Sequence, residues 1–252
     1  MRNPLSALLL GLTLFACKEE KPVVATFDMP EGVSSEQMKE NPFLGVWINS
    51  FYTVRILATK SPYEANEKAG KVSELSIDEK EIMLVYNNAE GERLPYTVSE
   101  NDEGYIIELP GGMSVSKRSS IPQLIVNEGK DQSVMTRSFS NLDGVSNVEV
   151  FVRSELIVGT YTKDGLEQAP VEFKLSGELI GIPGYSAYSV VTRFDDLCDF
   201  DAIELIGDEG STYVGWELDG DDLILYKTEP GTDYIYSKGR EWLRLSLIEA
   251  IG

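Results

Sequence analysis

Short alternations of apolar and polar residues, separated by glycine, asparagine, aspartate and proline, constrain this chain more than any other feature. Between Val171 and Leu175, apolar residues at every second position flank two charged ones. Because successive side chains of a β-strand point to opposite faces, this period of two predicts a half-buried strand. Similar runs predict strands at residues 53–58, 81–86, 105–109, 148–152, 213–218 and 223–226. No long helical periodicity competes with them, so we expect an all-β fold.

The order of these segments repeats along the chain. Residues 43–47, Phe-Leu-Gly-Val-Trp, are echoed by residues 157–161, Ile-Val-Gly-Thr-Tyr. A hairpin follows in each copy, at residues 96–109 and 214–226, and then an apolar strand that carries an arginine. Aligning the copies requires gaps, and chance similarity among β segments is the alternative. We expect two tandem β units, at residues 42–140 and 148–252, joined by turn residues at 141–147.

Glycine and an aromatic residue on a first strand, with arginine on a last strand, resemble the lipocalin-like (calycin) barrels. The resemblance implies two small antiparallel up-and-down barrels, in each of which the arginine packs on the aromatic ring and closes the base. The closure residues that it implies are Gly45, Trp47 and Arg137 in the first unit and Gly159, Tyr161 and Arg244 in the second. Residues 232–234, Thr-Asp-Tyr, are similar to a short second lipocalin motif.

The start of the chain has the layout of a secretory signal. Arg2 precedes an apolar stretch at residues 5–15, which is well short of the roughly 20 residues that cross a bilayer as a helix. Residues 14–17, Leu-Phe-Ala-Cys, resemble the lipobox of bacterial lipoproteins. The resemblance implies a signal peptide at residues 1–16 and an acylated (palmitate-bearing) Cys17. Residues 17–41 are polar and contain proline, glycine and serine, as expected of a flexible tether.

Lys18 follows the lipobox-like cysteine, at the place where an aspartate typically retains enteric lipoproteins at the inner membrane. The resemblance therefore implies an outer-membrane location and leaves open which face the protein occupies. The chain has 42 acidic and 22 basic residues and a formal net charge of −20. Nucleic acid is excluded as a partner, because binding it needs a basic footprint. The acidity is typical of colloidal repulsion, and a cationic partner is the alternative.

The residue inventory excludes most catalytic chemistry. The chain has no histidine and two cysteines, so His-based triads and zinc sites of the usual kind are excluded. If Cys17 is acylated, Cys198 has no disulfide partner in the chain, and we expect it to be a small buried residue. Ser-x-x-Lys at residues 114–117 lacks the helix and the companion motifs that this chemistry requires. We therefore expect no enzyme and no cofactor, with carboxylate-based hydrolysis left open.

A stretch rich in aspartate is one candidate cation site. Clustered carboxylates bind calcium, but the stretch lacks the glycine and the terminal glutamate of an EF-hand loop, so a solvated acidic loop is the alternative. The four candidate ligands are Asp195, Asp196, Asp199 and Asp201. Upstream of them, residues 181–188 are expected to form either a mobile loop over a barrel mouth or a plain surface loop.

These observations predict a membrane-anchored protein that binds rather than catalyses. Our first hypothesis is that a barrel interior or mouth holds a small apolar or amphipathic molecule, as the lipocalin resemblance implies. The second is a structural or interaction lipoprotein with solid barrels, whose acidic surface binds another envelope or host protein. A cavity of roughly 300 Å³ or more that is lined by aromatic residues supports the first hypothesis, and a packed interior supports the second.

Overall fold

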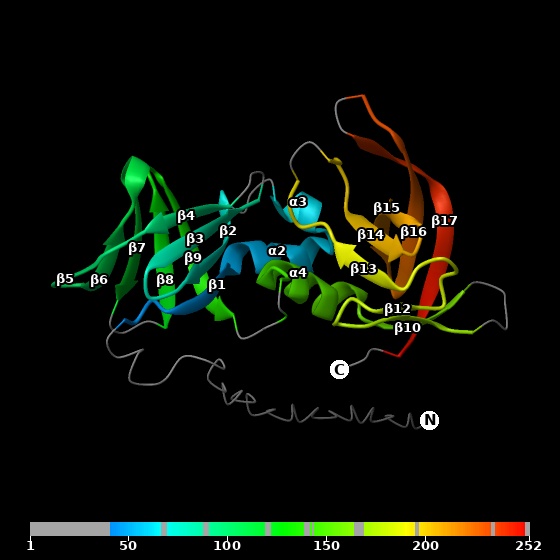
Figure 1. Ribbon diagram of the computed structural model, residues 1–252, viewed down its shortest axis with the longest axis horizontal. Coiled ribbons are helices and arrows are strands. Elements are labelled where there is room, and N and C mark those ends of the chain that lie inside the picture. Colours follow the sequence, from blue (N-terminus) through cyan, green and yellow to red (C-terminus); the bar gives the residue numbers. More distant parts are fainter. Residues whose placement is uncertain are drawn as a thin grey trace, which may run out of the picture.

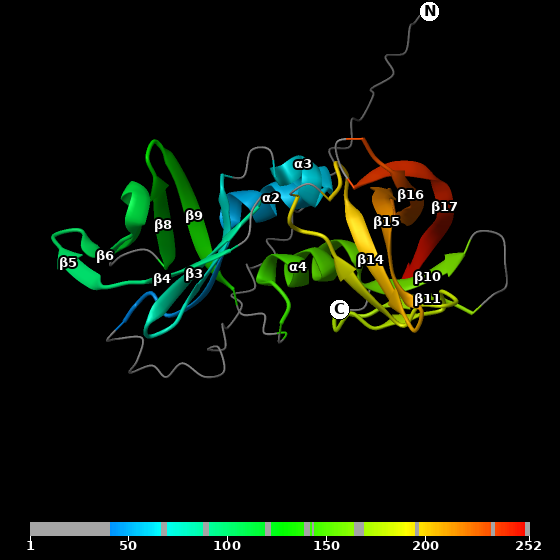
Figure 2. The ribbon, with the colours of Figure 1, turned by 45° about the horizontal axis from the view of Figure 1, so that its top comes forward.

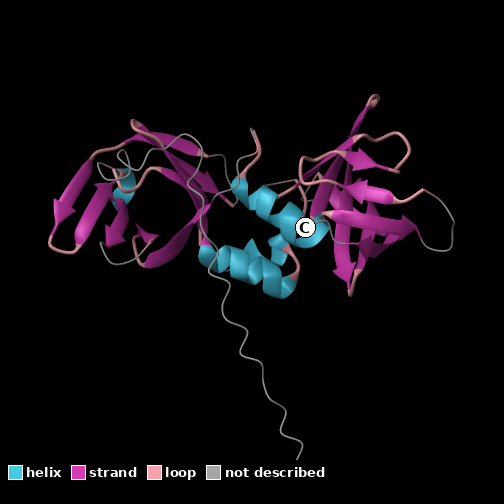
Figure 3. Ribbon diagram, turned by 90° about the horizontal axis from the view of Figure 1, so that it is seen from below, coloured by secondary structure: helices cyan, strands magenta, loops and turns pink. Residues whose placement is uncertain are grey.

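A computed structural model describes the chain at residues 41–66, 70–87, 91–118, 122–138, 142, 144–163, 169–194, 197–232 and 235–249. Two antiparallel sheets lie at opposite ends of the long axis, and helices fill the space between them (Figures 1 and 3). The fold is all-β with two barrel-like sheets, which confirms the class predicted from the alternating pattern. Residues 1–40, which include Cys17 and most of the expected tether, lie outside the described residues.

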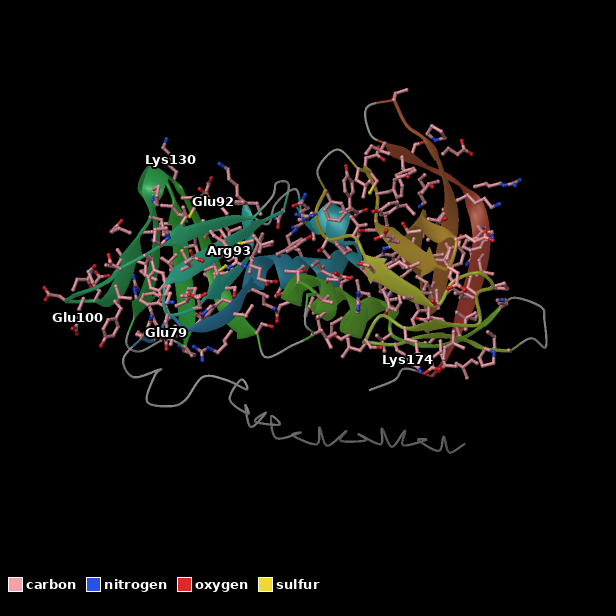
Figure 4. All side chains as sticks on the ribbon, in the orientation of Figure 1. Glu79, Glu92, Arg93, Glu100, Lys130 and Lys174 are labelled. Atoms are coloured by element: carbon pink, nitrogen blue, oxygen red, sulfur yellow. The ribbon has the colours of Figure 1, made fainter. Side chains whose placement is uncertain are left out.

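The first sheet is a half-barrel. Its strands, in chain order, are β1 (Gly45–Asn49), β2 (Val72–Ile77), β3 (Glu81–Tyr86), β4 (Glu92–Pro95), β5 (Val98–Asn101), β6 (Gly104–Glu108), β7 (Met113–Arg118), β8 (Gln123–Glu128) and β9 (Asp131–Ser138). They are hydrogen-bonded in the order β4-β3-β2-β1-β9-β8-β7-β6-β5, and a 3-10 turn (Pro110–Gly112) precedes β7. Charged side chains project from this unit, and Figure 4 labels Glu79, Glu92, Arg93, Glu100 and Lys130 among those that are exposed.

The second sheet curves into a nearly closed barrel (Figure 2). Its strands are β10 (Gly159–Lys163), β11 (Val171–Phe173), β12 (Leu179–Ile180), β13 (Ala187–Val190), β14 (Ala202–Gly207), β15 (Gly210–Asp219), β16 (Asp222–Pro230) and β17 (Tyr236–Glu249). The hydrogen-bonded order is β12-β11-β10-β17-β16-β15-β14-β13. An isolated bridge between Glu178 and Ala187, and a 2.9 Å bond from the amide of Leu179 to the carbonyl of Ser186, join the two edge strands.

The two units share one up-and-down path in which the first strand pairs with the last. Strands β4 and β5 are separated by two residues and pair with β3 and β6 respectively, so they form one bent strand across the open side. Each unit then has eight strand positions. This equivalence corrects the hairpin alignment made from the sequence, because residues 96–109 correspond to β13 and β14 rather than to β15 and β16. Alternating hairpins resemble one another, so pattern alone does not identify their position.

Two segments that were predicted as strands are helices. Residues 53–58 lie in α2 (Ser50–Thr59), which is followed by α3 (Pro62–Asn66). Residues 148–152 lie in α4 (Asn147–Val152), which continues as a short π-helix (Arg153–Ile157). The Asn49 side chain caps α2 by accepting from the amides of Phe51 and Tyr52, at 3.0 and 3.1 Å. Ser146 caps α4 in the same way. Caps of this kind satisfy the first amides of a helix, which have no partner within the helix. A prediction from apolar alternation alone does not take this signal into account.

The helices close one end of the second barrel. Tyr52 and Ile56 of α2, and Ala65 of α3, are buried in one hydrophobic core with Trp216 and Leu225 of the second sheet. The first sheet has a separate core around Trp47 and Leu75. The two sheets fall on either side of residues 141–147, but the core of the second barrel includes helices that precede this connection.

Candidate functional site between the barrels

The predicted closure residues of the first unit lie together. Trp47 of β1 is directly opposite Arg137 of β9, and the guanidinium carbon lies 4.7 Å from the centre of the indole ring. Arg137 also donates a 2.6 Å hydrogen bond to the carbonyl of Leu44. Gly45 has a φ of +118° beside this guanidinium, a backbone conformation that favours glycine. The indole N–H of Trp47 donates to the carbonyl of Phe43, at 2.8 Å, and fixes the ring.

The second unit repeats the aromatic anchor but not the arginine. The Tyr161 hydroxyl donates to the carbonyl of Ile157 at 2.7 Å, again four residues earlier in the chain. Gly159 is in register with Phe173, and Tyr161 is opposite Leu247, so the expected packing of Arg244 on Tyr161 is wrong. Arg244 is instead opposite Ile224. Its ion-pair partners are Asp219, Asp222 and Glu241.

A different arginine, Arg153, occupies the base of the second barrel. Its guanidinium carbon lies 5.1 Å from the ring centre of Tyr188, and its side chain is about 4% exposed. Arg153 donates to the carboxylate of Glu149 at 3.1 and 2.5 Å and to the carbonyl of Leu175 at 3.2 Å. Arg153 is not among the residues predicted from the sequence, because a strand at residues 148–152 hides the helical spacing of Glu149 and Arg153.

Two buried glutamates attach α4 to both sheets. Glu74 of β2 accepts hydrogen bonds from the amides of Asn147 and Val148, at 2.6 and 3.3 Å. Burial raises the pKa of Glu74, and these bonds oppose the shift. Glu149 accepts from the Ser189 hydroxyl and from the amide of Val190 in β13, both at 2.8 Å. The start of α4 is therefore held between the first sheet and the second by carboxylates that are already hydrogen-bonded.

Asp201, one of the predicted calcium ligands, also joins the units. Its carboxylate accepts a 2.8 Å hydrogen bond from the amide of Tyr63 at the start of α3. Asp201 therefore holds α3, which precedes the connection at residues 141–147, against the second sheet. Asp199 is exposed, and Asp195 and Asp196 lie outside the described residues. Among the residues that the structure describes, no group of three or more acidic or cysteine side chains could hold a metal ion.

The burial of Asp201 predicts a pH dependence of stability. Burial raises the pKa of Asp201 from 3.8 to about 6, so the folded state disfavours the charged form. Its contribution to stability is therefore complete below pH 3.8 and is lost as the pH rises through 6. We expect Asp201→Asn, which keeps an oxygen acceptor for Tyr63, to stabilise the protein at pH 8 by on the order of 2–3 kcal/mol. Urea unfolding at pH 8 and pH 4 tests this; an equal difference at both pH values would contradict it.

Cys198 is buried, as expected from the sequence. Its Sγ atom lies 3.2 Å from the carbonyl oxygen of Phe200, in a small apolar cluster that includes Ala202. The surroundings are those of a packed side chain rather than of an exposed, activated thiol.

Side chains fill the interior of the second barrel. In the second barrel the ring of Phe173 lies between those of Tyr161 and Tyr188, with ring centres 5.8 and 5.0 Å away. The large buried side chains of Trp216 and Leu225 pack in the same core. This interior is therefore filled rather than hollow, and it is packed like other protein cores.

A cleft of 410 Å³ lies between the two units. Met83 and Val85 of β3 form part of one wall, and Leu197 and Tyr213 of the second unit form part of the other. The start of α4, with the buried carboxylates of Glu74 and Glu149, forms the floor. Other lining residues are Ser73, Gly91, Gly144, Ser146, Val148, Ser189, Val190, Val191, Thr192 and Arg193. Apolar walls with a few convergent polar groups, at a contact between two units, are typical of ligand sites.

A second hollow lies at the end of the second barrel that faces away from the helices. A groove of 720 Å³ runs between residues 183–186 and 207–212, and a smaller one of 260 Å³ adjoins it beside Tyr185 and Trp242. Part of the segment predicted as a loop over a barrel mouth lies here. It is bound to the barrel by a 2.9 Å bond from the Ser186 amide to the carbonyl of Ile206. The larger groove is open and lined largely by small polar residues and backbone.

Comparison of the chain with protein-family models, with curated proteins and with solved structures finds no significant match. In the part of the chain that the structure describes, none of the helices has the length and apolar character needed to traverse a membrane.

Proposed function

We propose that this protein is a lipid-anchored, non-enzymatic binding protein of the cell envelope that holds a small amphipathic molecule between its two barrels. The lipobox-like residues 14–17 support acylation of Cys17, and Lys18 supports an outer-membrane location. The Trp47–Arg137 pair supports the resemblance of the first unit to lipocalin-like barrels. The observation that carries the proposal is the 410 Å³ cleft, because the interior of the second barrel is filled and the cleft, unlike the larger open groove at the barrel end, has apolar residues in both walls.

The walls and floor of the cleft define the ligand class. Met83, Val85 and Leu197 supply half-buried apolar surface for an aliphatic or aromatic body. The carboxylates of Glu74 and Glu149 and the hydroxyls of the floor are acceptors, so the polar group of the ligand should donate hydrogen bonds. An amine or a hydroxyl meets this requirement, whereas an anionic head group on the floor would face two buried carboxylates. Arg193, which also lines the cleft, is exposed. We therefore propose an amphipathic amine or alcohol as the ligand.

The hydrogen bonds of the floor support binding over catalysis. A general acid or base must be free to reach the proton that it transfers. Glu74 already accepts from the start of α4, and Glu149 is paired with Arg153 and Val190. Both carboxylates are therefore fixed in place by bonds to the protein. Their remaining lone pairs can accept hydrogen bonds from a ligand, but the groups are not free to carry a proton.

An interaction lipoprotein with solid barrels is the second candidate function. The filled interior of the second barrel favours it, because a packed barrel is a scaffold rather than a carrier. In that case a protein partner, rather than a small molecule, would bind on the surface. Titration with small amphiphiles separates the two candidates.

The cleft predicts a specific pattern of binding to simple amphiphiles. Dodecylamine, kept below its micellar concentration, is expected to bind more tightly than dodecyl sulfate in isothermal titration calorimetry. Val85→Arg and Leu197→Arg place a long charged side chain in the cleft from either wall, and each should weaken dodecylamine binding at least tenfold. Val98→Arg, on the exposed strand β5, is the matched control and should bind as the parent protein does.

Two outcomes would contradict this assignment. Equal affinities of the parent protein and the two cleft variants, with their folds intact by circular dichroism, would exclude the cleft. Loss of binding in Thr212→Arg but not in the cleft variants would move the ligand to the groove at the barrel mouth. Absence of binding to either amphiphile would favour the interaction lipoprotein.

A further inference from the structure

Helix α2 exposes an apolar stripe on the face opposite the second barrel. Phe51, Val54 and Leu57 are 53%, 62% and 47% exposed, and their spacing of three residues places them on one side of the helix. The other side carries Tyr52 and Ile56, which are fully buried in the barrel core. Single exposed apolar residues are normal on a protein surface, whereas three along one ten-residue helix form a continuous patch.

The charges on this helix differ from those on the rest of the chain. Residues 50–60 contain two basic residues, Arg55 and Lys60, and no acidic residue, in a chain with 42 acidic and 22 basic residues. The guanidinium carbon of Arg55 lies 5.9 Å from the ring centre of Phe51, so one cation is adjacent to the exposed stripe. Apolar residues flanked by basic ones are the composition of helices that lie in a membrane interface.

We propose that the stripe of Phe51, Val54 and Leu57 lies against the surface of an anionic lipid bilayer, with Arg55 toward the head groups. The proposal rests on the lipid anchor of the proposed function, which brings the chain to the membrane. Cys17 and Asn41, the first described residue, are 24 positions apart. An anchor at Cys17 would therefore keep the described residues near the bilayer.

Charge then selects how the protein lies on the membrane. A net charge of −20 repels anionic lipid over most orientations of the molecule. The α2 face brings Arg55 and an apolar stripe to the interface first, which favours that orientation over the others. Lys60 does not take part, because its Nζ atom donates a 3.2 Å hydrogen bond to the carbonyl of Gly220 in the second barrel. The lipid holds the chain at the membrane, and α2 orients it.

The test uses residues 17–252, the chain without its expected signal peptide, with Cys17→Ser, so that neither an acyl group nor the apolar stretch at residues 5–15 contributes to binding. The vesicles consist of phosphatidylglycerol or of phosphatidylcholine. We expect the variant to co-sediment with phosphatidylglycerol vesicles at low salt and to bind phosphatidylcholine more weakly. Adding Phe51→Ser and Val54→Ser should lower the partition coefficient for both lipids at least fivefold. Adding Arg55→Gln should lower it for phosphatidylglycerol alone. Val98→Ser with Ile206→Ser removes two other exposed apolar residues and should leave binding unchanged.

The outcomes separate this proposal from the lipid anchor. If the folded Cys17→Ser chain binds neither lipid, or binds equally with and without Phe51 and Val54, the proposal for α2 is wrong and the face belongs to a protein partner. Cell fractionation tests the anchor by itself: Cys17→Ser should be released from the membrane fraction at high salt, whereas the parent chain should be retained. Release of both would refute the anchor while leaving the vesicle result for α2 intact.

Discussion

Replacing Arg153 with alanine is expected to lower the free energy of unfolding by about 3–5 kcal/mol. The change leaves the buried carboxylate of Glu149 without its cation, and a broken buried ion pair is far more costly than a lost surface pair. It also removes the contact with the ring of Tyr188 and the hydrogen bond to the carbonyl of Leu175. Urea unfolding followed by tryptophan fluorescence measures the loss.

Two variants show whether the loss comes from the unpaired charge. Glu149→Gln combined with Arg153→Met removes both charges and should recover a large part of the stability, because the cost lies in burying one ion alone. Arg244→Ala is the surface control, since this arginine pairs with acidic residues in solvent and should change stability much less. A loss for Arg244→Ala as large as that for Arg153→Ala would show that Arg153 is not the structural arginine of the second barrel.

Ile56→Ala is expected to destabilise the second barrel, although Ile56 precedes that barrel by about a hundred residues. Removing a fully buried isoleucine costs about 2–5 kcal/mol, because part of the cavity stays empty. Hydrogen exchange followed by mass spectrometry should show faster exchange in β14, β15 and β16. The first sheet, whose core is separate, should keep its protection.

Val54→Ala is the matched control on the same helix. Val54 is exposed and should change stability by no more than about 0.5 kcal/mol. If Ile56→Ala loosened the first sheet alone, or left the exchange of β14 to β16 unaltered, α2 would not be part of the second barrel's core. The cores would then divide as the sequence does, at residues 141–147.

Much of the strand pattern could be predicted from the sequence. Residues 81–86 coincide with β3, and residues 213–218 and 223–226 lie within β15 and β16. Strand prediction failed at residues 53–58 and 148–152, because short apolar runs fit a helix and a strand equally well. Start signals for both helices were present. Asn49 precedes α2 directly, and Ser146 with Glu149 has the Ser-x-x-Glu spacing of a capping box.

The candidate site was beyond prediction for a different reason. Its floor joins Glu74 to the amide of Asn147, 73 residues later in the chain, and Glu149 to that of Val190, 41 residues later. Such contacts depend on how two sheets pack, and periodicity within a segment does not describe that packing. The sites predicted from the sequence lie in the barrel interiors and at the aspartates near Cys198. Recognising α4 as a helix would have revealed the spacing of Glu149 and Arg153.

The position of α2, directly after β1 and inside the core of the second barrel, sets an order of assembly. During synthesis the helix emerges long before β10 to β17, the strands against which it packs. A chain interrupted after β9 would leave Tyr52, Ile56 and Ala65 uncovered, and so would expose apolar surface. The later half must therefore close around a piece of the earlier half. The two barrels resemble each other in path, but they are not interchangeable modules, and cutting the gene between them would leave neither product whole.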